Sequence, residues 1–256
     1  MFGSNPIRSV EQDTASLAVQ DIFYTIQGEG PYAGCPAVFI RLAGCNLACT
    51  FCDTEFETGI NNRMTLHAIL EDVHTKAQAA KYPTTAYNLV VLTGGEPLRQ
   101  RCGHLIQHLL DAGVRHIQIE TAGTLWDDEL VPFIASHKLT LVCSPKTPRI
   151  HPLIARYCSH YKYIIQRGRT AEDDGLPIGG TQPGNHLMPQ RLHRPWDVTQ
   201  GHVRHPITVW VSPCDETDPV LGRKTTLNTE ETVRVAMLHG YRLSIQMHTL
   251  EGVDLL

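Results

Sequence analysis

Three cysteines close together in the chain have the spacing that most clearly indicates chemistry. Cys45, Cys49 and Cys52, three of the eight cysteines, form a C-x3-C-x2-C loop directly after an apolar run. Where disulfides do not form, clustered cysteines more often bind a metal or react. Structural zinc normally takes four protein ligands, usually as paired C-x2-C units. An iron–sulfur cubane held by only three thiolates leaves one iron without a protein ligand, free to bind a substrate or cofactor.

A second short motif, Leu92-Thr-Gly-Gly-Glu-Pro97, stands at the end of an apolar run and before a helical pattern. Glycines at such a place let the backbone approach a ligand closely. In parallel sheets, ligand sites gather at the carboxyl ends of the strands. Taken alone, the motif is equally typical of a tight turn between a strand and a helix.

The elements that must position these motifs alternate between strands and helices. Helical periodicity is expected over 66–77, 98–110, 127–137 and 228–240, with Thr65 as the N-cap of the first helix and Asn228 with Glu231 as a capping box for the last. Several of the strands are almost continuously apolar, as expected for parallel strands covered on both faces. Such βα units predict a parallel sheet, either open and doubly wound or curved towards a barrel. The strands are predicted at 21–26, 37–42, 88–93, 116–121, 139–143, 161–166, 207–212 and 242–247.

Two segments depart from this pattern. Residues 1–16 predict a flexible N-terminal tail, so that the domain proper is expected over 17–256. The region of about 168–206 is rich in Gly, Pro, His and Arg and has little period, which indicates an inserted surface loop rather than a second domain.

Composition narrows the class of protein. The 256 residues are 42% hydrophobic and 19% charged, which is an ordinary globular mixture. Lys and Arg number 22 against 26 Asp and Glu, a net charge of −4 that disfavours general binding to nucleic acid or to anionic membranes. We find neither a signal peptide nor an apolar run long enough to span a membrane, and therefore expect a cytoplasmic protein.

The cysteine loop after a strand, together with the Gly-Gly-Glu motif, resembles the radical S-adenosylmethionine (SAM) superfamily. The resemblance implies an α/β fold, an incomplete and splayed (β/α) barrel. It also implies a [4Fe–4S] cluster on Cys45, Cys49 and Cys52, whose fourth iron chelates SAM. One electron then cleaves SAM to methionine and a 5′-deoxyadenosyl radical.

Further segments narrow the resemblance to the 7-carboxy-7-deazaguanine synthases. This family converts 6-carboxy-5,6,7,8-tetrahydropterin to 7-carboxy-7-deazaguanine with loss of ammonia, a carbon–nitrogen lyase step of queuosine biosynthesis that needs Mg²⁺. It implies a homodimer and a reductase such as flavodoxin or ferredoxin. The segments run in family order from about residue 21 to the end: Thr25-Ile-Gln-Gly-Glu-Gly30, Val38-Phe-Ile-Arg-Leu-Ala-Gly-Cys45, Cys52-Asp-Thr54, Ile119-Glu-Thr-Ala-Gly-Thr124, Ser144-Pro-Lys146, Ser212-Pro-Cys-Asp215 and Arg242-Leu-Ser-Ile-Gln-Met-His248.

The resemblance assigns roles to single residues. Thr54 matches the magnesium ligand of the family. Its hydroxyl suits that role, because Mg²⁺ takes oxygen ligands and draws others from water and substrate. The substrate residues are expected to include Arg41, whose guanidinium suits a carboxylate. The full substrate set is Ile26, Gln27, Gly28, Glu29, Arg41 and Thr93. The SAM set is Phe51, Cys52, Asp53, Gly95, Ser144, Pro145, Lys146, Ser212, Pro213, Cys214 and Asp215. Glu120 could reach the SAM ribose or form a structural ion pair.

Two other functions are compatible with parts of the pattern. One is a radical SAM activase that installs a glycyl radical on a partner protein, and the other is an interaction protein that uses the cysteine loop to hold zinc. At the C-terminus, many family members close on a proline that contacts substrate. This chain has Asp254 followed by Leu255-Leu256, and whether Asp254 replaces that contact is left open.

Overall fold

The computed structural model describes residues 5–78, 88–185, 188–197, 206–215 and 225–247. Its centre is one nine-stranded sheet in the order β3-β1-β2-β4-β5-β6-β7-β8-β9. β1 is antiparallel to β2 and to β3, and the run β2-β4-β5-β6-β7-β8-β9 is parallel throughout. The strands span Ser16–Ile26 (β1), Pro36–Leu42 (β2), Arg63–Thr65 (β3), Leu89–Gly94 (β4), His116–Thr121 (β5), Leu139–Cys143 (β6), His160–Ile165 (β7), Thr208–Pro213 (β8) and Arg242–Leu243 (β9).

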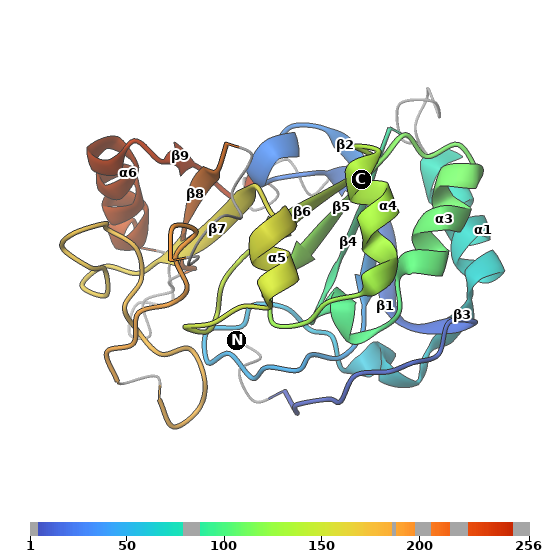
Figure 1. Cartoon of the computed structure of the whole chain (residues 1–256), viewed down its shortest axis with the longest axis horizontal. Coiled ribbons are helices and arrows are strands. Elements are labelled where there is room, and N and C mark those ends of the chain that lie inside the picture. The colour runs from blue at the N-terminus through green and yellow to red at the C-terminus, as the bar shows by residue number, and fades with distance from the viewer. Residues whose placement is uncertain (1–4, 79–87, 186–187, 198–205, 216–224, 248–256) are drawn as a thin grey trace.

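Helices follow the strands and cover one face of the sheet. Figure 1 shows α4 and α5 in front of the central strands, with α6 at the far end beside β8 and β9. α1 packs on β1 and β2, α4 and α5 pack on β6, and α6 packs on β8. The α-helices are Leu66–Gln78 (α1), Gly103–Asp111 (α3), Val131–Ala135 (α4), Pro152–Tyr157 (α5) and Leu227–His239 (α6). The short 3-10 helices are Gly30–Tyr32, Thr58–Asn61, Pro97–Arg99 and Asp128–Leu130.

The two faces of the sheet differ in chemistry because side chains alternate along each strand. On the helix-covered face, Ile40, Leu92 and Ile119 belong to the main core together with Ile69 of α1 and Leu105 of α3. On the opposite face, the described residues form a small buried apolar cluster of Ala37, Phe39, Leu89 and Val91. Further along the same face the strands turn polar towards their carboxyl ends. The expectation that the apolar strands are covered on both faces is therefore wrong, because the helices lie on one face. The expected splayed barrel fits this one-sided arrangement.

Most predicted elements are confirmed, and the differences have local causes. Thr65 accepts the N–H of Ala68 at 3.2 Å, as an N-cap should. The capping box at Asn228 is wrong, because that buried side chain bonds the backbone of Arg167 and Cys214 instead. β3 and α5 were not predicted, since three and six residues show too little periodicity.

The first and the last of the predicted strands differ in length from those observed. β1 begins at Ser16 because Ser16–Ala18 pairs with β3. β9 ends at Leu243 rather than 247, because the chain then turns towards the loop after β1. There Ser244 Oγ accepts the N–H of Gly30, and Met247 N–H donates to the carbonyl of Gly28.

Residues 5–15, which we expected to belong to a flexible tail, lie against the rest of the chain. Ile7 forms a β-bridge with Cys45, and Arg8 N–H donates to the Cys45 carbonyl at 2.7 Å. Glu11 pairs with the buried Arg99 at 2.6 Å. The described part of the segment is thus bonded to the cysteine loop, while the domain boundary at residue 16 stays a prediction.

The expected insertion around 168–206 is ordered around a buried ion pair over its described residues, 168–185 and 188–197. The guanidinium of Arg194 is fully buried and donates to both oxygens of Asp174, at 2.7 and 3.2 Å. Arg191 also reaches Asp174 at 2.7 Å. Bidentate pairing of this kind fixes orientation as well as distance, so this part of the insertion has a defined place.

Candidate active site

The cysteine loop and the Gly-Gly-Glu motif pack directly on one another. A Cβ at Gly94 would lie 2.1 Å from the carbonyl oxygen of Leu42, and one at Gly95 would lie 2.2 Å from that of Gly44. The Gly95 and Glu96 N–H groups donate to these same two carbonyls. Both glycines are therefore required by close approach to the chain that enters the cysteine loop. Whether Gly95 also contacts SAM stays a prediction.

Glu96 is a buried residue of this junction that the sequence analysis did not assign. Its carboxylate accepts hydrogen bonds from Thr121 Oγ1 at 2.7 Å, Ala122 N–H at 2.8 Å and Leu98 N–H at 3.1 Å. Burial raises the pKa of this carboxyl, and the three donors oppose the shift. Glu96 thereby ties the end of β4 to the end of β5. Its position before Pro97 was the available signal, since a carboxylate there can cap the turn that follows.

The three cysteines of the loop lie close enough to act on each other electrostatically. Burial raises the pKa of the Cys45 thiol to about 12, with smaller contributions from Cys49 and Cys52. Burial also raises the pKa of Cys52. A bound metal has the opposite effect on these thiols, because it deprotonates a coordinating thiol outright.

The chemistry of the loop fits a cluster better than a single ion. Leu47 N–H points to Cys45 Sγ at 3.4 Å, and the Gln182 amide points to Cys49 Sγ at 3.2 Å. Such donors favour thiolate ligands. Within the described part of the chain, no group of three or more His, Cys, Asp or Glu side chains could hold one metal ion. A cubane makes a different demand, since each thiolate binds its own iron.

A network of polar side chains lies beside this loop, on the face of the sheet opposite the helices. Glu120 accepts hydrogen bonds from Gln27 Nε2 at 3.1 Å, Thr93 Oγ1 at 3.0 Å and Gln118 Nε2 at 3.0 Å. Two of these donors, Gln27 and Thr93, are predicted substrate residues that lie far apart in the sequence. Glu120 therefore lies among the predicted substrate residues, and its own role stays a prediction.

Arg41 lies next to Thr93 in the β2–β4 ladder. Its guanidinium stacks 5.1 Å from the centre of the Phe23 ring. Arg41 Nε and Gln118 Oε1 are buried and have no hydrogen-bond partner among the described residues. Because buried polar groups are normally paired, a donor and an acceptor left open on this face indicate that a polar ligand completes them.

A buried ion pair lies on the same face, nearer to β8. Lys162 Nζ donates to Glu29 Oε2 at 2.6 Å, and Ser212 Oγ donates to Glu29 Oε1 at 3.2 Å. Glu29 N–H in turn donates to Gln27 Oε1 at 3.1 Å, which links the pair to the Glu120 network. Burial alone lowers the pKa of Lys162, but Glu29 and Glu120 outweigh it and hold that pKa above its ordinary value. The ammonium therefore stays charged at neutral pH. Sequence analysis missed Lys162, although one charge inside an apolar strand was a signal.

Replacing Lys162 by methionine should lower the free energy of unfolding by about 3 kcal/mol, because the variant removes the positive charge that compensates the buried Glu29 carboxylate. Urea denaturation measures the change. Lys138→Met at an exposed lysine is the matched control and should change stability by less than about 0.5 kcal/mol. The double variant Lys162→Met with Glu29→Gln should recover part of the loss. Equal stability of Lys162→Met and Lys138→Met would contradict the assignment.

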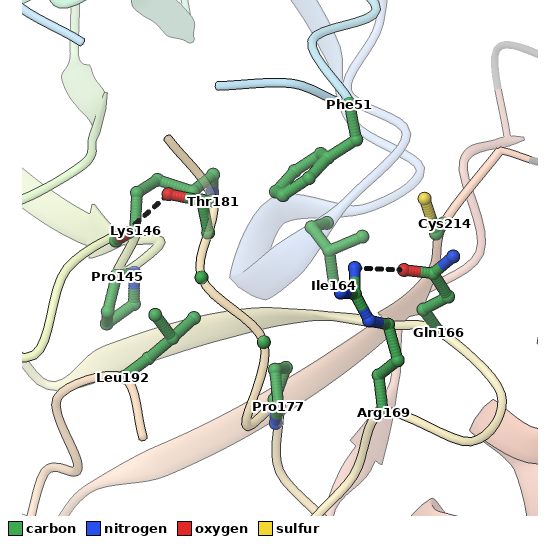
Figure 2. Close-up of a pocket in the computed structure, with 12 residues that line it drawn as sticks. Phe51, Pro145, Lys146, Ile164, Gln166, Arg169, Pro177, Thr181, Leu192 and Cys214 are labelled. Carbon is green, nitrogen blue, oxygen red and sulfur yellow. Dashed lines mark hydrogen bonds between the residues drawn. The ribbon is translucent and has the colours of Figure 1, made fainter. Parts of the chain in front are cut away.

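A pocket next to the cysteine loop brings together predicted SAM residues from three parts of the chain. Figure 2 shows Phe51 of the loop, Pro145 and Lys146 after β6, and Cys214 after β8 around one space. Lys146 Nζ lies 6.0 Å from the centre of the Phe51 ring and donates to Ser144 Oγ at 2.5 Å. Burial lowers the pKa of Lys146, and the neighbouring Cys49 opposes this. The remaining lining residues come from β7, from the residue just after it and from the insertion: Ile164, Gln166, Arg169, Pro177, Gly179, Gly180, Thr181 and Leu192.

The other predicted site residues lie around the Glu120 network and the pocket next to the cysteine loop. Ser212 is fully buried and bonds Glu29, away from the pocket that Cys214 lines, whereas Asp215 is exposed. Thr54 Oγ1 donates to Asp53 Oδ1 at 2.9 Å. The SAM and magnesium roles of these residues stay predictions, and Asp254 lies outside the described residues.

Comparison with known proteins agrees with this geometry. The radical SAM superfamily matches residues 39–173, which include the cysteine loop and the Gly-Gly-Glu motif. A 7-carboxy-7-deazaguanine synthase of Rhodospirillum rubrum is 42% identical over 98% of this chain and 98% of its own length. The synthase of Rickettsia prowazekii is 37% identical over 99% of this chain and 96% of its own length.

The fold has a counterpart among solved structures. The crystal structure of QueE from Escherichia coli superposes with a TM-score of 0.59 at 20% identity, over 91% of this chain and 95% of that chain. The superposition supports the fold, a nine-stranded sheet that does not close. The extent and identity of the sequence matches show that the chain belongs to the 7-carboxy-7-deazaguanine synthase family of radical SAM enzymes.

Proposed function

We propose that this enzyme converts 6-carboxy-5,6,7,8-tetrahydropterin to 7-carboxy-7-deazaguanine with loss of ammonia, as a step of queuosine biosynthesis. One observation carries the proposal. The cysteine loop, the pocket of predicted SAM residues and a polar face with unpaired buried groups all lie at the carboxyl ends of neighbouring parallel strands. This is where ligands meet in sheets of this kind.

The polar face has the chemistry to hold a carboxylated pterin. The edge of a pterin ring alternates hydrogen-bond donors and acceptors, and Gln27, Gln118 and Glu120 together offer amide and carboxylate groups to match it. The unpaired Nε of Arg41 suits the substrate carboxylate. The Glu29–Lys162 pair holds Gln27 in place through the Glu29 N–H bond.

When bound, the [4Fe–4S] cluster and SAM supply the radical that removes a hydrogen from the ring carbon bearing the carboxylate. Cys45, Cys49 and Cys52 would hold the cluster, and the pocket around Phe51 and Lys146 would hold SAM. The protein groups bind, orient and shield the reactants, while the cofactors carry the difficult chemistry.

Magnesium, the reductant, oligomeric state and location belong to the proposal as well. Thr54 would bind Mg²⁺ with its hydroxyl, next to the carboxylate of Asp53. A flavodoxin or ferredoxin would deliver the electron, the enzyme would be a homodimer, and it would act in the cytoplasm. None of the described helices has the length and hydropathy of a membrane span.

An anaerobic assay tests the proposed reaction. Reconstituted protein is incubated with carboxytetrahydropterin, SAM, Mg²⁺ and dithionite, and the products are followed by mass spectrometry. We expect 7-carboxy-7-deazaguanine and ammonia in equal amounts. Cleavage of SAM with unchanged pterin would reject this substrate while leaving the radical SAM chemistry in place.

A further inference from the structure

The inserted region docks onto the cysteine loop through Thr181. The Thr50 N–H donates to the Thr181 carbonyl at 2.8 Å, and Thr181 Oγ1 donates to the Lys146 carbonyl at 2.7 Å. Thr181 is only 2% exposed. One residue of the insertion is thus held between the cysteine loop and the segment after β6 (Figure 2). Sequence periodicity gave this region no role.

The next residue, Gln182, contacts a cysteine sulfur. Its Oε1 accepts the Ala48 N–H at 2.8 Å, and its Nε2 lies 3.2 Å from Cys49 Sγ. A backbone N–H can only donate, so the amide oxygen must face Ala48 and the NH₂ group must face the sulfur. The amide is therefore oriented as a donor to Cys49 by the cysteine loop itself.

Two neighbouring side chains of the insertion hold Gln182 in this position. Gln182 N–H donates to Asn185 Oδ1 at 2.9 Å, and the second N–H of the side chain reaches Thr181 Oγ1 at 2.8 Å. A Cβ at Gly180 would lie 2.1 Å from the Asn185 carbonyl oxygen, so the turn closes tightly beneath the amide. The donor is in place before any ligand arrives.

Thr181 does not compete for this role. Its hydroxyl lies 4.0 Å from Cys49 Sγ, and its hydrogen is directed to the Lys146 carbonyl. Among the described residues, the side-chain N–H that reaches Cys49 Sγ is that of Gln182.

Hydrogen bonds to ligand sulfurs are one of the means by which a protein sets the reduction potential of an iron–sulfur cluster. Reduction adds one electron, so the reduced cluster is more negative than the oxidised one. An N–H donor stabilises the more negative form and raises the potential. We propose that Gln182 is a positioning residue for the cluster, which donates a hydrogen bond to the Cys49 thiolate and makes the cluster easier to reduce. This inference rests on the proposed cluster at Cys45, Cys49 and Cys52.

The experiment is a redox titration of anaerobically reconstituted full-length protein, without SAM or substrate. Dithionite supplies one electron per cluster, and electron paramagnetic resonance measures the reduced fraction at fixed potential. Gln182→Leu removes all three side-chain hydrogen bonds. Gln182→Glu keeps an acceptor for Ala48 N–H but has no donor for the sulfur and adds a negative charge. The matched control is Gln107→Leu, the same substitution at an exposed glutamine of α3 that bonds Asp111.

At the potential where the wild type is half reduced, the ratio of reduced to oxidised cluster should fall about fivefold in Gln182→Leu and at least about tenfold in Gln182→Glu, where tenfold corresponds to ~59 mV for one electron. Gln107→Leu should keep the wild-type ratio. Iron content, expected at about four per chain in every variant, shows that the comparison is made on intact clusters.

Two results would overturn the inference. One is an unchanged ratio in both Gln182 variants at full iron content. The other is a shift in Gln107→Leu as large as that in Gln182→Leu, which would show that the shift does not come from the hydrogen bond to Cys49. A wild type that has a normal titration but forms no deazaguanine product would reject the proposed reaction and leave this inference standing.

Discussion

Replacing Cys49 by alanine is expected to abolish cluster-dependent cleavage of SAM, and Cys45→Ala and Cys52→Ala should have the same effect. Three thiolates are the fewest that hold the cubane while leaving its fourth iron free for SAM. No replacement site is at hand, since the described part of the chain holds no group of three or more His, Cys, Asp or Glu side chains that could bind a metal ion. Iron content, visible absorption and formation of 5′-deoxyadenosine measure the loss.

The other cysteines provide the controls for this prediction. Cys35 is exposed and lies outside the loop, so Cys35→Ala should keep about four irons per chain and full product formation. Cys102, Cys143 and Cys158 are buried, and their replacement should leave iron content unchanged even where it lowers stability. If Cys49→Ala retained the wild-type iron content and product formation, the cluster would have to lie elsewhere.

Much of the fold could be predicted because its signals are local. The buried strands β5 and β6 were predicted with their observed bounds, since continuous apolar runs ended by polar residues define them. The close packing of Gly94 and Gly95 on the cysteine loop also follows a local motif. Each motif follows the end of a strand, and the two lie beside one another in the structure.

The contacts that complete the site could not be predicted because they join distant residues. Glu29 and Lys162 are separated by 133 positions, and Cys49 and Gln182 likewise by 133. Neither pair has a periodic pattern that would bring its members together. The insertion has little hydrophobic period because its described part is held by an ion pair between Arg194 and Asp174 and by backbone hydrogen bonds to the cysteine loop. Polar contacts of this kind become visible only in the folded chain.

The distribution of charge explains how one sheet serves both stability and binding. The helix-covered face is apolar and forms the main core, so the opposite face does not have to be apolar. That face can carry Arg41, Glu120 and Lys162, each costly to bury unless it is paired. Glu120 and Lys162 are paired within the chain, while Arg41 keeps an unpaired Nε. The group left open is the one predicted to meet the substrate carboxylate.

The Thr54→Val variant should lose product formation by about 100-fold or more, in line with lost orientation of the substrate. The Thr54 hydroxyl donates its hydrogen to Asp53, so the lone pairs of its oxygen remain available to a cation. Mg²⁺ held by this oxygen and by the substrate carboxylate would orient the pterin towards SAM. Valine removes the oxygen at nearly constant volume, so iron content and SAM binding should not change.

Magnesium dependence separates this role from a structural one. Adding Mg²⁺ to metal-depleted wild type should stimulate turnover, whereas Thr54→Val should respond little. The matched control is Thr58→Val, four residues later in the same segment, where an exposed threonine bonds Gln20 and has no predicted ligand. This variant should keep both the rate and the magnesium response. Because the metal needs the substrate carboxylate as its charged ligand, Mg²⁺ should bind well only when the pterin is present. Full stimulation by Mg²⁺ in Thr54→Val would place the metal on other ligands.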